Sequence, residues 1–585
     1  MKKIIFLVCC LCIIGGFSYF LSRPAPPKPP QNYYAHFLPD DVVAVLSLYD
    51  MEGLSTAFPG TPLGRFLSKP VMHEIMGELG GTDEDLEKYD AFYNAVADVM
   101  TSPIFRQVFG DDAVIALCPP DPERLQDNPE QELKNSILAF GTSSSAGPIG
   151  RFARLVMRKD MTNAEVAGLD MTRIRLDENE MLYGYDDQGI IVLAYDPRRI
   201  VSAVERKATG KNLRHAESFT ATESFWKEER TGQLYAHAYL NAISLQELVS
   251  AFTQEKGQQA AETMTGRVTE ELAGIKSIGG VIIENQGELR LRMKGEVNPK
   301  SLPNQVQEVQ AGEVLSDNED LALSLLQANT LLHYRLSHFD KAFFRNFLAS
   351  AKTKQQYSEL EKTVQDEVGF SLNKFLEAVG PQAGISVHEI VNAGMFPLPK
   401  TILALKVQDK KAVGWALKKL RGTLKKQGLV NERQEKIQGH RFYYWTIMPV
   451  EASHLAIALT DTMLYIANGE SQLRTLLEGA QDPKTLADNM VKELGETAGT
   501  CVATANSDAF LLRPERLAGQ LAPIADWLTN MLWASRTGSG RKMQEEVLTL
   551  MRSFDFVAAC SDLVETHVRA EVIFKTLPKT GEEKE

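Results

Sequence analysis

The chain of 585 residues is 44% hydrophobic and 24% charged, a composition typical of folded globular proteins. Its net charge is −13 at pH 7, and residues 1–31 carry only positive charge, so the remainder is the acidic part. An acidic body argues against nucleic acid as a partner, because phosphate neutralisation needs clustered Lys and Arg. The length predicts several domains or two large ones.

The N-terminus, residues 1–22, is predicted to be a signal anchor, that is, an uncleaved transmembrane helix. Lys2 and Lys3 precede an apolar run at residues 4–21, which as a helix would span ~27 Å, just enough for a bilayer core. The residues that follow form a poor cleavage site, which disfavours a cleaved secretion signal, and the cysteines at residues 9–12 lack the small residues before them that lipidation needs. All three export the body. The two lysines favour a single pass through the cytoplasmic (inner) membrane, with the N-terminus inside and the body periplasmic.

A Pro-rich linker is predicted at residues 23–36, and a polar tail at residues 578–585. The run at residues 24–30 favours extended polyproline, a semi-rigid spacer that would hold the body ~20 Å from the membrane.

The body contains an internal repeat. Residues 181–205 superpose on 454–478, and both read as strand, tight turn, strand and helix. The same order is kept by further pairs of segments: 109–117 over 379–387, 136–140 over 401–405, 45–48 over 333–336 and 266–281 over 540–557. We therefore predict two tandem homologous units, at 37–300 and 326–577, with a linker at 301–325.

Each unit is predicted to be α+β. A strand opens it (42–48 and 330–336), a long helical stretch follows, and most of the later strands are joined by hairpins. Hairpin-linked strands predict a mainly antiparallel sheet, and we expect the helices to pack on one face of it.

The cysteines show no metal-ligand spacing. Three lie in the apolar run, and Cys118, Cys501 and Cys560 are scattered. Cys501 and Cys560 could pair if their strands are neighbours, but buried free thiols are the favoured interpretation, and dependence on a disulfide is not predicted.

The motifs that suggest chemistry fail on spacing. His73-Glu74 and His388-Glu389 lack the histidine at i+4 that a zinc protease needs, so both histidines are expected at the surface or partly buried. Residues 209–211 and 538–542 lack the full phosphate-loop pattern and are expected to be turns, and residues 141–147 lack the spacing of a serine nucleophile elbow. No catalytic, cofactor-binding or metal-binding residue is predicted, and no cofactor is expected.

One helix is strongly basic. In residues 410–426 an apolar stripe at helical spacing predicts packing against the sheet, and cations cover the rest. The corresponding helix of the first unit is basic as well. The predicted patch comprises Lys410, Lys411, Lys418, Lys419, Arg421, Lys425, Lys426, Arg151, Arg154 and Arg158. It is either a solvated outer face or a surface for anionic lipid, wall polymer or an acidic envelope protein.

The anchor, the Pro-rich spacer, the lead-in Leu38-Pro39-Asp40-Asp41 and the duplicated units together resemble bacterial signal-anchored envelope proteins that carry a domain of unknown function. The resemblance implies an extracytoplasmic location and no catalytic residue.

Three classes of function follow from these expectations. The favoured one is a non-enzymatic, membrane-anchored periplasmic binding or scaffold protein, because neither copy carries a reactive constellation. The alternatives are an envelope hydrolase whose site is assembled in space, and a carrier of lipid or polypeptide.

Overall fold

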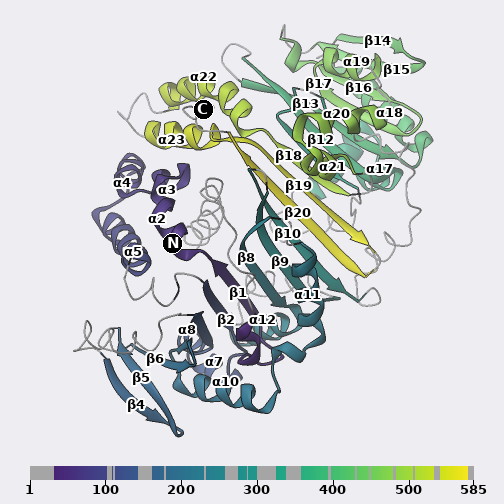
Figure 1. Cartoon of the computed structure of the whole chain (residues 1–585). Coiled ribbons are helices and arrows are strands. Elements are labelled where there is room, and N and C mark those ends of the chain that lie inside the picture. Colours follow the sequence, from purple (N-terminus) through teal and green to yellow (C-terminus); the bar gives the residue numbers. More distant parts are fainter. Residues whose placement is uncertain are drawn as a thin grey trace. The chain divides into compact units, whose positions relative to one another are not determined.

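The computed structural model divides the chain into two compact units (Figure 1). Unit 1 comprises Met1–Pro303, Gly538–Leu550 and Val564–Ala570, and unit 2 comprises Asn304–Thr537, Met551–Leu563 and Glu571–Glu585. The structure describes residues 32–101, 109, 112–142, 161–176, 180–229, 232–256, 274–285, 287–298, 325–327, 329–337, 358–392, 397–427, 431–446, 450–478, 483–504, 507–532, 540–564 and 566–577.

Several predicted segments fall outside the described residues. These are the anchor and most of the Pro-rich linker (1–31), nearly all of the linker between the repeats (301–324) and the tail (578–585). Among the described residues, no helix is long and apolar enough to cross a membrane.

Unit 1 contains an antiparallel sheet in the hydrogen-bonded order β10–β9–β8–β1–β2–β3–β7–β6–β5–β4. Its strands are β1 (Ala44–Tyr49), β2 (Asp112–Leu117), β3 (Ile137–Thr142), β4 (Met161–Val166), β5 (Leu169–Arg175), β6 (Met181–Asp187), β7 (Ile190–Ala194), β8 (Gln233–Asn241), β9 (Ile275–Asn285) and β10 (Glu288–Val297). The predicted turn between β6 and β7 is present, with Gly189 at φ 94°.

The helices of unit 1 are η2 (Tyr33–His36), α2 (Met51–Ala57), η3 (Phe58–Gly60), α3 (Pro62–Phe66), α4 (Lys69–Glu78), α5 (Asp83–Thr101), α7 (Pro122–Asp127), α8 (Pro129–Asn135), α10 (Pro197–Thr209), η4 (Leu213–His215), α11 (Glu217–Glu228), α12 (Ala242–Lys256) and most of α23 (Arg541–Met551). The predicted turn at residues 209–211 is the C-terminal end of α10, where Gly210 adopts the left-handed conformation at φ 73°.

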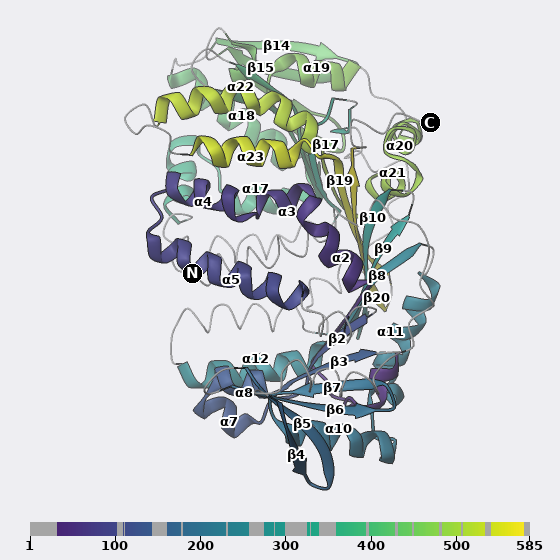
Figure 2. The same ribbon diagram turned by 60° about the vertical axis from the view of Figure 1, so that its left-hand side comes forward.

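Helices cover both faces of the unit 1 sheet, so the prediction that they gather on one face is wrong. Val114 and Ala116 of β2 belong to the main core, to which α10 and α11 contribute. Leu117, whose side chain alternates to the other face, packs with Leu125 of α7 and Leu245 of α12. Figure 2 shows α11 and α12 on opposite sides of the sheet.

Unit 2 contains a sheet in the order β20–β19–β18–β11–β12–β13–β17–β16–β15–β14, antiparallel from β19 to β14. Its strands are β11 (Leu332–Leu336), β12 (Val379–Asn392), β13 (Pro397–Val407), β14 (Asn431–Ile437), β15 (His440–Thr446), β16 (Leu455–Leu459), β17 (Met463–Asn468), β18 (Asp508–Leu512), β19 (Phe554–Val564) and β20 (His567–Thr576), of which residues from Glu571 onward belong to unit 2.

The helices of unit 2 are η8, a π-helix (Val364–Val368), α17 (Leu372–Ala378), α18 (Lys410–Gln427), η9 (Glu451–Ser453), α19 (Glu470–Glu478), α20 (Pro483–Leu494), α21 (Glu496–Ala503) and α22 (Pro514–Leu532).

Helices cover both faces of this sheet as well. Along β15, Phe442 and Tyr444 face the core that includes α19, whereas Tyr443 and Trp445 face the core that includes α18. Four successive apolar residues in one strand need cover on both faces of the sheet, and these two cores supply it. The sheet thus fixes α18 with its apolar stripe inward.

Candidate functional site

The predicted basic helix is α18, and the sequence around it explains why it forms. Asp409 caps its N-terminus by accepting hydrogen bonds from the backbone N–H groups of Lys411 (2.9 Å) and Ala412 (3.0 Å). Its apolar stripe, with Val413 and Leu417 as buried members, packs on β15, β16 and β17. The prediction that this stripe faces the sheet is confirmed.

The outward side of α18 carries five exposed lysines, which we call the basic face. They are Lys411, Lys418, Lys419, Lys425 and Lys426. Within the described part of the chain, none of the five forms an ion pair. The helix contains no acidic residue, and its 18 residues extend over ~27 Å. The basic face is therefore an extended row of positive charge that no ion pair in the described structure neutralises.

Two residues of the predicted patch are engaged within the protein. Lys410 forms an ion pair with Asp461, and the Arg421 guanidinium forms one with Glu432. Arg421 also lies 3.7 Å over the ring of Tyr443. These contacts hold α18 on the sheet and remove both cations from the exposed row.

The basic face also includes an aromatic residue that was not predicted to be part of it. Trp415 lies one turn after Lys411 and one turn before Lys419, and its side chain is 50% exposed. The Lys419 ammonium is 5.4 Å from the centre of its ring, a cation–π contact.

Acidic residues approach the basic face at one place. The hydroxyl of Thr423 donates to the main-chain carbonyl of Glu367, 3.2 Å away, so η8 packs against α18. Asp366 and Glu367 are exposed there. They moderate the positive potential locally.

A second polar cluster, on the buried face of β11 and β12, contains two histidines. His333 and Ser386 are paired across the two strands, with 2.7 Å between His333 Nδ1 and Ser386 Oγ. His388 lies two residues after Ser386 on the same face, and its Nδ1 is 3.2 Å from Thr330 Oγ1. Both histidines are at most 1% exposed, so the expectation that His388 is at the surface or partly buried is wrong.

Burial keeps both imidazoles neutral. Burial and the nearby Arg335 guanidinium lower the pKa of His333 to about 3, and burial lowers the pKa of His388 to about 4. Neither Nε2 atom has a hydrogen-bond partner.

The Ser386–His333 pair resembles a nucleophile and its base in composition only. Both residues are 0% exposed, so no substrate reaches the serine hydroxyl. A histidine with a pKa of about 3 is also too weak a base to accept the proton of that hydroxyl at neutral pH. The described residues include no group of three or more His, Cys, Asp or Glu side chains that could hold a metal ion. The cluster is thus part of the interior of unit 2.

Unit 1 also contains a buried histidine. His237 on β8 has Tyr34 Oη 2.7 Å from Nε2 and Tyr49 Oη 2.9 Å from Nδ1. The indole of Trp226 stacks on the imidazole with ring centroids 3.9 Å apart. Both nitrogens are engaged and no substrate could reach them, because His237 is 1% exposed.

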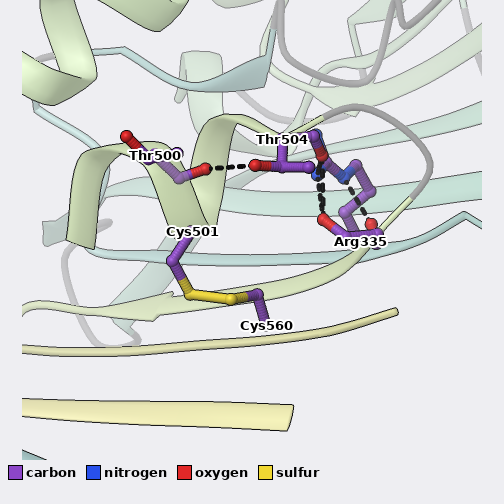
Figure 3. The surroundings of a disulfide bond; sticks show 6 residues. Arg335, Thr500, Cys501, Thr504 and Cys560 are labelled. Carbon is purple, nitrogen blue, oxygen red and sulfur yellow. Dashed lines mark hydrogen bonds between the residues drawn. A yellow bond between two sulfur atoms is a disulfide. The ribbon is translucent and has the colours of Figure 1, made fainter. Parts of the chain in front are cut away.

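A disulfide joins Cys501 of α21 to Cys560 of β19, with Cα atoms 5.5 Å apart (Figure 3). The favoured interpretation of buried free thiols is therefore wrong for this pair, and correct for Cys118, which is buried and free. Cys501 lies on a helix rather than on a neighbouring strand. Beside it, Arg335 donates to the main-chain carbonyl of Thr504, 2.5 Å away, at the C-terminal end of α21.

Comparisons with known proteins add little. No protein-family model matches this chain. No curated protein matches it either. Among solved structures, crystal form III of TP0453 matches with 7% identity over 49% of this chain and 88% of that one, and crystal form I matches with 8% identity over 47% and 82%. The TM-score is 0.23 in both cases, too low to support an argument about fold or function.

The structure thus brings together one part of the predicted patch. The basic face keeps five of the seven predicted cations of α18 and gains Trp415. Arg151, Arg154 and Arg158 lie outside the described residues.

Proposed function

We propose that this protein is a non-enzymatic, membrane-anchored extracytoplasmic binding or scaffold protein that holds an anionic partner on the basic face of α18. The observation that carries this proposal is the row of five exposed lysines, none of them in an ion pair with any described residue, in a protein whose net charge is −13. Such a row in an acidic protein steers an anionic partner toward one surface, because the positive potential is concentrated there.

The energetics favour a partner with many negative charges. A single exposed ion pair contributes little, typically below about 1 kcal/mol. Five lysines along ~22 Å of helix can each meet a separate charge of an extended anion, so their contributions add up while each remains sensitive to salt. Binding should therefore be multivalent and should weaken as ionic strength rises.

Two observations support export of the body. The apolar run at residues 4–21 has the length of a membrane-spanning helix and follows two lysines. The Cys501–Cys560 disulfide is expected in an oxidising compartment such as the periplasm and is rare in the cytosol.

We also propose that the two units arose by tandem duplication. The support is the strand order: each strand of unit 1 has its counterpart in unit 2 at a label ten higher, along the whole series from β10 and β20 to β4 and β14. Two units of independent origin would not be expected to share the order of all ten strands. The basic face would then be a specialisation of one copy, on a helix that follows the third strand of its unit.

The hydrolase alternative finds no support in the pair that would suit it best, because Ser386 and His333 are buried and the histidine pKa is far too low. We therefore place the function on the surface of unit 2 rather than in its interior.

The proposal is tested by retention of the full-length, detergent-solubilised protein on a phosphocellulose column. Reversing four lysines of the basic face, with Lys418, Lys419, Lys425 and Lys426 all changed to Glu, should shift elution to much lower salt.

The matched control reverses four exposed lysines elsewhere that form no ion pair in the described structure: Lys211, Lys362, Lys436 and Lys492. Both variants change the net charge equally, so only position differs. Equal losses of retention would mean that net charge alone matters, and the proposal would fail.

A further inference from the structure

We infer that the anionic partner of the basic face is a membrane surface, into which Trp415 inserts its indole ring. This inference rests on the proposed function and specifies its ligand as anionic lipid head groups. It comes from one feature that charge alone does not explain, the exposed tryptophan in the middle of the lysine row.

Trp415 differs from the tryptophans in the interior. Its side chain is 50% exposed, whereas Trp226 and Trp445 are 2% and 1% exposed. Leaving half of an indole in water forgoes the favourable transfer of its apolar surface. Tryptophan is, however, well suited to the boundary between lipid head groups and acyl chains, where its ring is buried and its N–H stays near polar groups.

The surroundings of Trp415 match that boundary. Lys411, Lys418 and Lys419 lie within one turn of it on the same side of α18, and Lys425 and Lys426 extend the row. Lysine side chains are long enough for their ammonium groups to stay at phosphate level while the helix lies along the surface. The Lys419 ammonium is already beside the ring, at 5.4 Å. The helix thus presents cations to head groups and one indole to the layer below.

The way α18 is held determines the depth of binding. Its apolar stripe, including Val413 and Leu417, belongs to the core of unit 2 and is unavailable to lipid. The helix therefore cannot bury an apolar face as an amphipathic peptide does. Binding is peripheral, through charge and a single ring, and is reversible by salt.

The same features disfavour a polyanionic polymer as the partner. A polyphosphate or acidic wall polymer offers charges but no apolar layer, so an exposed indole would gain nothing from it. The proposed anchor at residues 1–22 would also tether the chain to a bilayer, and tethering raises the effective concentration of the membrane surface.

The test uses the full-length chain reconstituted in lipid nanodiscs whose acyl chains carry bromine, which quenches tryptophan emission on contact. Discs of phosphatidylcholine alone are compared with discs containing about a third phosphatidylglycerol, near the anionic content at which basic segments bind. The wild type should show extra quenching only in the anionic discs. Trp415→Phe, which removes the fluorophore, should abolish the extra quenching, and so should the reversal of Lys418, Lys419, Lys425 and Lys426 to Glu.

A second variant measures the contribution of insertion. Trp415→Ser should weaken the association of the basic face with anionic discs by about tenfold, as loss of an indole from the interface predicts. Its retention on phosphocellulose should not change, because that matrix has no apolar layer.

The outcomes separate this inference from the function on which it rests. If extra quenching is absent in anionic discs while lysine reversal still abolishes phosphocellulose retention, the protein binds anions but not membranes, and the inference is overturned. If lysine reversal has no more effect on retention than the control reversal, the proposed function itself fails. Equal quenching in wild type and Trp415→Phe also overturns the inference.

Discussion

Acidification should loosen unit 2, because two buried histidines there are held neutral. The pKa of His333 is lowered to about 3 and that of His388 to about 4, from an ordinary value of 6.5. As the pH falls below 6.5 the unfolded chain binds protons that the folded unit does not. The stability that the pair contributes is therefore complete above the unfolded pKa and is lost progressively as the pH falls toward the folded values.

The size of the loss follows from the shifts. Between about pH 7 and about pH 5, each histidine lowers the free energy of unfolding by about 2 kcal/mol, and the pair by about 4 kcal/mol. Whole domains are typically stable by only about 5–15 kcal/mol. The groups around the pair do not offset the loss: Ser386 and Thr330 are neutral hydroxyls, and Arg335 repels an imidazolium.

Hydrogen exchange of peptides from β11 and β12, followed by mass spectrometry across this pH range and corrected for intrinsic exchange rates, measures the effect locally. In a double variant, His333→Asn and His388→Asn, an amide replaces each Nδ1 and keeps the contact with its hydroxyl, but does not titrate. The free energy of opening of β11 and β12 in this double variant should change little with pH. His215→Asn, at an exposed site, is the matched control and should keep the wild-type slope. A wild-type slope in the double variant would refute the reasoning.

Two further predictions concern stability. Replacing Cys501 and Cys560 together with serine should lower the free energy of unfolding by about 4 kcal/mol, the chain-entropy value for their sequence separation of 59, and added reductant should then have no further effect in urea titrations. Gly279→Ala should cost about 1–3 kcal/mol, because its Cβ would lie 2.4 Å from the methyl group of Thr222. The adjacent Gly280→Ala, whose nearest neighbour would be 3.8 Å away, should change stability by less than about 1 kcal/mol in the same thermal melts, and equal losses at both sites would contradict this account.

The strands were largely predictable from the sequence, because apolar runs bounded by turn residues mark them. The opening strand predicted at 42–48 is β1 (Ala44–Tyr49), and the one predicted at 330–336 is β11 (Leu332–Leu336). The polar strand β4 was missed, since it has no apolar alternation. The short helices α7 and α8 were missed although Asp121-Pro122 and Asn128-Pro129 carry clear start signals, a capping side chain followed by proline.

The arrangement of the helices was mispredicted because it was inferred from the hairpin connections, whereas the apolar runs within the strands indicate which faces of the sheet are covered. Residues 442–445, 455–459 and 463–467 are apolar at nearly every position, a pattern that predicts burial on both faces. That signal was available and points to the helices found on each side, α18 and α19.

If the two units are equivalent, the sequence alignment of β3 with β13, the third strand of each unit, must be shifted by one residue. The sequence superposes Ser136 on Thr401, whereas the registers pair Ile137 with Leu117 and Thr401 with Val387. Since side chains alternate along a strand, a slip of one residue exchanges the faces, and sequence similarity in short apolar segments does not resolve it.

Residues that meet only through the fold were beyond sequence reasoning. Cys501 and Cys560 are 59 residues apart, and His333 meets Ser386 across two strands joined by a long connection. Trp415 is different, because counting helical positions from Lys411 and Lys419 places it on the polar side of α18, so the sequence contained the signal.

The interior of unit 2 bears directly on the surface that we propose to be functional. At two successive inward positions of the first strand of the sheet, unit 1 has Val45 and Ser47, whereas unit 2 has His333 and Arg335. A buried guanidinium and imidazole are stable only while other elements supply partners, and these come from β12 and from the end of α21 that the disulfide holds. In the sheet, β11 is connected through β12 and β13 to β17, β16 and β15. The last three are the strands on which α18 packs. Acid or reductant that loosens β11 should therefore also loosen α18 and its basic face, whereas β1, with Val45 and Ser47 at its buried positions, carries no such charged side chain.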